Sequence, residues 1–81
     1  MIKNATYWIF DRILFRPIKV KFLGFNEETD GWMRFKYLET TSESGEFTAY
    51  PPSDINVTVF RSRPACLRAT MDKLMDLLHT N

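Results

Sequence analysis

The sequence predicts a single α+β domain, in which an antiparallel sheet of four to five strands has one C-terminal helix packed on one face. Three observations support this prediction. Residues 18–39 form two segments of alternating apolar and polar side chains around a turn-rich hexapeptide, the pattern of a β-hairpin. Shorter segments with strand-like composition flank this hairpin. Residues 67–78 repeat apolar side chains at helical spacing.

Length and composition limit the class of protein. The 81 residues suit one domain, residues 1–81, and a hydrophobic fraction of 44% with 15% aromatics argues against disorder. The longest apolar run, residues 7–10, is far shorter than the roughly 20 residues of a membrane helix. The N-terminus does not resemble a secretory signal, and a single cysteine excludes an internal disulfide. We therefore expect a cytoplasmic protein that does not enter a membrane.

Residues 4–15 fit two templates. As a helix capped by Asn4, the segment forms an apolar stripe. As a strand, it aligns alternate residues on one face, interrupted by Asp11: Tyr7, Ile9, Ile13 and Phe15. Its aromatic and β-branched content favours the strand. Arg16-Pro17 ends the segment in either case, because proline lacks an amide donor and disfavours helical geometry in the residue before it.

The central hairpin allows its register to be predicted. Its arms, residues 18–25 and 32–39, are joined by a polar turn at 26–31 that ends in glycine. Pairing Phe25 with Trp32 brings apolar side chains together on one face: Val20 with Tyr37, Phe22 with Phe35, and Gly24 with Met33. The other face then carries Lys21 opposite Lys36, Leu23 opposite Arg34, and Lys19 opposite Leu38. A shift by one residue would mix the two faces.

Two shorter strands are expected after this hairpin. A polar connector over residues 40–45 leads into a strand at 46–50, which Pro51-Pro52 ends as a rigid corner. Residues 55–60 alternate again and predict a strand with Ile55, Val57 and Val59 on one face.

The C-terminal helix has the clearest signals. Ser62 is placed to cap its N-terminus, and Pro64 lies in the first turn, where proline is tolerated. The apolar stripe of this helix has five members, Leu67, Met71, Leu74, Met75 and Leu78. We expect the stripe to be buried against the apolar face of the sheet.

Residues able to do chemistry are few and scattered. His79, the only histidine, lies near the end of the predicted helix, where a solvated side chain is expected. Cys66 lies near the helix N-terminus, where the pKa of a thiol can fall, although a small buried residue is the favoured interpretation. Glu27, Glu28 and Asp30 cluster in the hairpin turn without the ligand spacing of a calcium loop. We therefore expect no catalytic residue, no metal site and no cofactor.

The polar face of the hairpin is the candidate binding site. Phe25 and Trp32 near the turn are placed to stack on bases or to contact a protein. Like charges opposite each other on two strands cost stability, so the cations on this face favour an anionic ligand, either nucleic acid or an acidic partner. The cations, with two arginines expected to extend the set, are Lys19, Lys21, Arg34, Lys36, Arg61 and Arg63. The plainer interpretation is a solvated face balanced by nearby acids.

The chain is short and dense in aromatic residues, which concentrate in two segments, Tyr7-Trp8-Ile9-Phe10 and Gly31-Trp32-Met33-Arg34-Phe35-Lys36-Tyr37. In this character the chain resembles the small accessory proteins that T4-like phages use to redirect a host or block its defences. The resemblance implies a small inhibitor or modulator that acts by binding in the host cytoplasm.

We therefore expect a non-catalytic module that binds a host macromolecule. A host protein is the leading hypothesis for the partner, recognised by exposed aromatics and by residues 26–54, which carry a net charge of −5. RNA or DNA bound on the basic face is the alternative. A homodimer formed through an open sheet edge is a further hypothesis.

Overall fold

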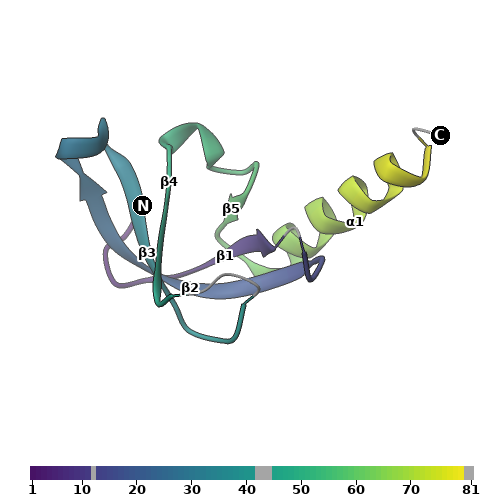
Figure 1. Ribbon diagram of the computed structural model, residues 1–81, viewed down its shortest axis with the longest axis horizontal. Helices are drawn as coiled ribbons and strands as arrows, with labels where there is room; N and C mark the ends of the chain where they lie inside the picture. The colour runs from purple at the N-terminus through teal and green to yellow at the C-terminus, as the bar shows by residue number, and fades with distance from the viewer. Residues whose placement is uncertain (12, 42–44, 80–81) are drawn as a thin grey trace.

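The computed structural model describes residues 1–11, 13–41 and 45–79. Within these residues it confirms the α+β class, with five antiparallel strands in one sheet and one C-terminal helix against it (Figure 1). The strands are β1 (Thr6–Asp11), β2 (Arg16–Asn26), β3 (Trp32–Tyr37), β4 (Phe47–Tyr50) and β5 (Val59–Phe60). The helix, α1, spans Arg63–His79. The helical segments of the described chain are too short or too polar to span a bilayer.

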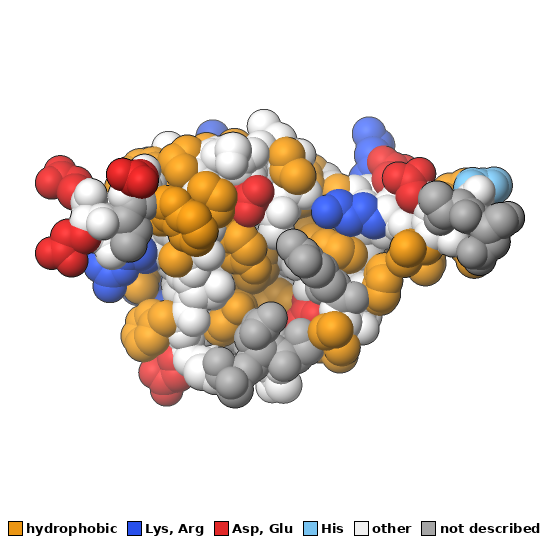
Figure 2. Space-filling model, turned by 45° about the horizontal axis from the view of Figure 1, so that its top comes forward, with side chains coloured by type: hydrophobic (Ala, Val, Ile, Leu, Met, Phe, Trp, Pro, Cys, Tyr) orange, Lys and Arg blue, Asp and Glu red, His pale blue; other side chains and the backbone are white. Residues whose placement is uncertain are grey.

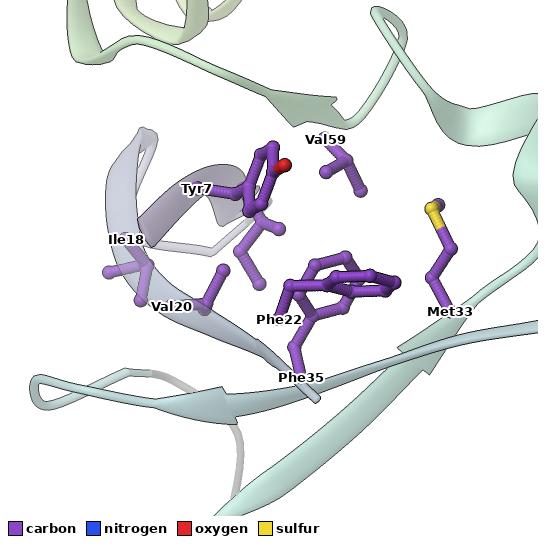
Figure 3. Close-up of a cluster of buried hydrophobic side chains, with 8 residues drawn as sticks. Tyr7, Ile18, Val20, Phe22, Met33, Phe35 and Val59 are labelled. Carbon is purple, nitrogen blue, oxygen red and sulfur yellow. The ribbon is translucent and has the colours of Figure 1, made fainter. Parts of the chain in front are cut away.

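The sheet encloses its own core. Its order is β4-β3-β2-β1-β5, so the first four strands form a meander and β5 returns to the other side of β1. Tyr50 from one edge strand and Val59 from the other pack in the same cluster. Its buried members are at most 2% exposed although α1 packs on the other face, so the sheet curls around them. Figure 3 shows this cluster, in which the rings of Phe22 and Phe35 lie 5.6 Å apart. Its buried members are Tyr7, Ile9, Ile18, Val20, Phe22, Met33, Phe35 and Val59.

The first strand is shorter than its apolar pattern suggests. Residues 6–11 are a strand, as their composition predicts, but the chain then turns and leaves Ile13 74% exposed. Asp11 holds this turn, because its Oδ1 accepts hydrogen bonds from the backbone N–H groups of Ile13 (2.9 Å) and Leu14 (3.0 Å). Asp11 is 6% exposed. The prediction that Ile13 and Phe15 continue the core face of the strand is therefore wrong.

The hairpin register is confirmed over three pairs and then changes. Val20 lies opposite Tyr37, Lys21 opposite Lys36, and Phe22 opposite Phe35, all as predicted. The pairing shifts between Phe22 and Gly24, where Leu23 is the extra residue of a β-bulge. Gly24 has a φ of 120°, which glycine adopts without the steric clash that a Cβ would cause. Beyond the bulge, Phe25 pairs with Met33 and Asn26 with Trp32, so the predicted pairing of Phe25 with Trp32 is wrong.

The segment between β4 and β5 departs from the strand predicted at 55–60. Pro52–Asp54 form a short 3-10 helix, and the Asp54 carbonyl then accepts hydrogen bonds from the N–H groups of Val57 (3.0 Å) and Thr58 (2.9 Å). This turn leaves Val57 exposed and restricts the strand to Val59–Phe60. The strand predicted at 46–50 is confirmed as β4, one residue shorter. Residues 42–44 of the predicted connector lie outside the described part of the chain.

The helix packs on the opposite face of the sheet from the one predicted. Cys66 is buried in a second cluster with Phe10 and Phe60, which point away from the core because they alternate with Ile9 and Val59. The predicted cap is confirmed, since Ser62 Oγ accepts a hydrogen bond from the Ala65 N–H at 3.3 Å. Figure 1 shows α1 starting beside β1 and β5 and extending away from β3 and β4.

Candidate functional site

Two surfaces of the molecule have the composition of binding sites. The first is the helix stripe, defined as Leu67, Met71, Leu74, Met75 and Leu78. The second is the basic face, defined as Lys19, Lys21, Arg34 and Lys36 on the side of the sheet away from the core. They lie on different elements, α1 and the β2–β3 hairpin, so each is described separately.

The helix stripe faces solvent, and the prediction that it is buried on the sheet is wrong. Its exposed fractions, in chain order, are 36%, 58%, 44%, 54% and 71%. The helix contacts the sheet instead through small residues on its other side, Cys66, Ala69 and Thr70. At 3.6 residues per turn, the centre of this contact side and the centre of the stripe lie about 130° apart around α1. Figure 2 shows hydrophobic side chains at the surface of the projecting helix.

The C-terminal half of α1 extends beyond the sheet. Lys73 lies on the contact side, with its Nζ 4.9 Å from the centre of the Phe10 ring. One turn later, Leu77 lies on the same side and is 56% exposed. The molecule is correspondingly elongated, at 41 × 24 × 22 Å. The last turns of the helix are therefore accessible from most directions.

The basic face places two like charges at directly opposed positions on neighbouring strands. Lys21 and Lys36 are paired residues, and the row continues to Thr6 on β1 and to Phe47 on β4. Arg34 lies in the next row, between Gly24 and Ala49. Among the described residues, no carboxylate forms an ion pair with Lys21, Arg34 or Lys36. Lys19 is less isolated, because Glu39 Oε1 accepts a hydrogen bond from its backbone N–H at 3.2 Å.

The structure separates the other predicted site residues. Trp32 shares the basic face and is 40% exposed, whereas the bulge moves Phe25 to the core face, where its ring lies 5.2 Å from that of Phe22. Arg61 lines a pocket of about 260 Å³ with Met1 and Tyr7, on the core side of the sheet. Arg63 begins α1 near Cys66. The two arginines therefore do not extend the basic face, and their binding role stays a prediction.

Phe47 is the residue of this surface that sequence reasoning missed. It is 59% exposed, lies opposite Lys36, and lines a shallow hollow of about 300 Å³ together with Leu23, Arg34 and Ala49. The strand pattern at residues 46–50 contained the signal, because the parity of Phe47 and Ala49 places both on one face. What the sequence lacked was the pairing of β4 with β3.

The remaining candidate groups lie apart from both surfaces. Cys66 is fully buried, and burial raises the pKa of its thiol from 9.0 to about 11, which excludes the activated thiolate interpretation. His79 is exposed at the end of α1, as expected. Glu27 and Glu28 begin a 3-10 turn, in which Asn26 Oδ1 accepts a hydrogen bond from the Glu28 N–H at 3.0 Å. No cluster of acidic, histidine or cysteine side chains in the described ranges has the arrangement of a metal site.

Comparison with known proteins adds no assignment: no protein family, curated protein or solved structure matches the chain significantly.

Proposed function

We propose that this protein is a non-catalytic module that binds another protein through the helix stripe and thereby inhibits or modulates it. The observation that carries the proposal is the orientation of α1. Five large apolar side chains face solvent, while the small residues of the same helix contact the sheet. A contiguous apolar patch of this kind on a small domain marks an interaction site.

The spacing of the stripe suits a helix that docks in a groove. Its members recur at three- and four-residue intervals from Leu67 to Leu78, the anchor pattern of helix-in-groove recognition. These residues span about 16 Å at 1.5 Å per residue. Since these side chains are 36–71% exposed in the free protein, complete burial of each contributes about half of the roughly 1.5–3 kcal/mol of a fully exposed side chain. Two of the five are methionines, whose flexible side chains adapt to an uneven surface.

The partner that fits this helix has an apolar groove with a polar rim. Arg68 and Asp72 lie beside the stripe on successive turns and are both exposed, so charged groups would meet the edge of such a groove. A host protein with a groove of this kind accords with the resemblance to phage accessory proteins. In this proposal, occupation of the groove is itself the means of inhibition, and the module contributes no catalytic group.

The test compares two double variants of the tagged protein. Met71→Gln/Leu74→Gln replaces two members of the stripe, and glutamine keeps a helix propensity close to that of methionine and leucine. Ile13→Gln/Val57→Gln is the matched control, because it replaces two apolar residues that are 74% and 52% exposed elsewhere on the molecule. A protein captured by the wild type from the native source is purified, and its affinity for all three forms is measured by titration calorimetry.

The stripe variant is expected to bind the recovered partner at least about tenfold more weakly, because two half-exposed anchors are lost. The control is expected to bind like the wild type. Equal binding by the stripe variant, or no stoichiometric partner, would contradict the proposal. If the wild type self-associates and Met71→Gln/Leu74→Gln abolishes this association, the partner of the stripe is a second copy of this chain and not a host protein.

A further inference from the structure

We infer that the open half of the outer sheet surface is a second binding site, which takes a short single-stranded nucleic acid. This site, called the strand site below, consists of Lys21, Arg34, Lys36, Trp32 and Phe47. It is independent of the helix stripe, since α1 packs against β1, β2 and β5 around Phe10 and Phe60, whereas most of the strand site lies on β3 and β4. Its ligand class follows from the charges, the aromatic rings and the shape of the surface.

The cations of the strand site are placed for a row of phosphates. Lys21 and Lys36 are cross-strand partners, and Arg34 lies two residues from Lys36 on the same side of β3. Three cations thus lie within neighbouring rows, and no carboxylate of the described chain neutralises them by an ion pair. Such an arrangement costs stability in the free protein, and an anionic polymer that spans the rows relieves it.

Exposed aromatic rings flank these cations. Trp32 and Phe47 are 40% and 59% exposed and lie on β3 and β4. Trp32 and Lys36 are four residues apart, about 13 Å along the strand, and Phe47 lies opposite Lys36. The two rings therefore flank Arg34 and Lys36, with Trp32 farther along β3 and Phe47 beside Lys36 on β4. Unpaired bases stack on such rings, whereas the bases of a duplex are not available to them.

The surface between the rings is shallow and open. The hollow beside Arg34 and Phe47 has a volume of about 300 Å³ and is also lined by Leu23 and Ala49. Leu23 is the extra residue of the β-bulge. Acidic residues of the β2–β3 turn, Glu27 and Glu28, are exposed beyond Trp32 and would repel phosphates from that end. The phosphate backbone of the bound nucleic acid is therefore expected to follow the Lys21–Lys36 row.

Fluorescence anisotropy with labelled oligonucleotides of about ten nucleotides tests the inference. Single-stranded RNA, single-stranded DNA and a duplex of the same sequence are titrated with the full chain at about 50 and 200 mM salt. We expect both single strands, or one of them, to bind more tightly than the duplex. Their affinity should fall with a log–log salt slope of about −2, because three cations contribute roughly 0.7 each.

Two pairs of variants separate the strand site from general electrostatic attraction. Lys21→Gln/Lys36→Gln should weaken binding by roughly tenfold and flatten the salt slope, because two phosphate contacts are lost. Arg61→Gln/Arg68→Gln removes the same charge outside the strand site and should bind like the wild type. Phe47→Ala should lose at least about fivefold in affinity, whereas Phe47→Tyr keeps a stacking ring and should retain it.

The contradicting outcomes are equally specific. The inference fails if no single strand binds at low salt, if the duplex binds as tightly, or if polyglutamate competes as well as the oligonucleotide. It also fails if Phe47→Ala binds like the wild type, or if the Arg61/Arg68 control weakens binding as much as the Lys21/Lys36 variant. The stripe variant Met71→Gln/Leu74→Gln should bind the oligonucleotides like the wild type, because the helix stripe is not part of the strand site. Failure of the strand-site inference would therefore leave the proposed protein-binding function untouched.

Discussion

Lys21 and Lys36 lie directly opposite each other on β2 and β3, without an acidic partner among the described residues. Two like charges in this position destabilise a sheet, so the free protein carries an electrostatic cost on its open surface. The same pair is the centre of the strand site. Stability and binding should therefore respond in opposite directions when one of the two charges is reversed.

Lys36→Glu should stabilise the protein by about 0.5 kcal/mol, because repulsion from Lys21 becomes attraction across the strands. Lys3→Glu, at an exposed residue near the N-terminus, is the control for the change in net charge. Urea unfolding monitored by tryptophan fluorescence measures both variants. A Lys36→Glu protein less stable than the Lys3→Glu protein would show that the cations do not repel each other significantly.

Gly24→Ala should destabilise the protein by about 1–3 kcal/mol, because a φ of 120° is strained for every residue with a Cβ. A Cβ at this position meets no atom within 4 Å, so the loss would come from the backbone conformation and not from a clash. The midpoint of urea unfolding reports it. An unchanged midpoint would mean that the bulge can take another backbone conformation.

The Cys66 thiol should make folding sensitive to alkaline pH. Its pKa is about 11 when folded and 9.0 in the reference state, so the folded protein retains a proton that the unfolded chain loses between these values. Stability should therefore be fully present below about pH 9 and fall as the pH rises towards 11. Other groups titrate in this range, so the difference between the wild type and Cys66→Ala isolates the thiol. An identical pH profile for the two proteins would contradict the assignment.

The same burial should protect Cys66 from alkylation. We expect iodoacetamide at pH 8 to react slowly with the native protein and rapidly in denaturing urea, as followed by intact mass. Rapid modification of the native protein would place the thiol at the surface.

The strand pattern of the sequence was sufficient for the fold class and for the central part of the hairpin. Alternation alone sets Lys21 against Lys36 and Phe22 against Phe35, because any shift by one residue would expose the core. The bulge at Leu23 and Gly24 shifts the register beyond these pairs, because it adds one residue to β2. A glycine inside a strand pattern is a known signal for such a bulge, so this part was within reach of the sequence.

The face of the sheet on which the helix packs could not be predicted from the sequence. Its periodic stripe predicted burial on the sheet, but the sheet closes its own core with Tyr50 and Val59 from opposite edges. The helix then docks through Cys66 and Thr70, small residues that a hydrophobic pattern does not distinguish. Contacts between strands far apart in the sequence close the sheet's core and so determine which side of α1 packs against the sheet. The amphipathic pattern of one helix does not contain that information.

The central claim is that the helix stripe faces away from the protein's own sheet and is free to bind a partner. The most direct measurement is the free energy of unfolding of Met71→Gln/Leu74→Gln at low protein concentration. The structure predicts a value within about 0.5 kcal/mol of the wild type, because both side chains are already about half exposed, at 58% and 44%, and lie outside the two buried clusters. A loss of about 4 kcal/mol or more would show that the stripe belongs to the core and would contradict the claim.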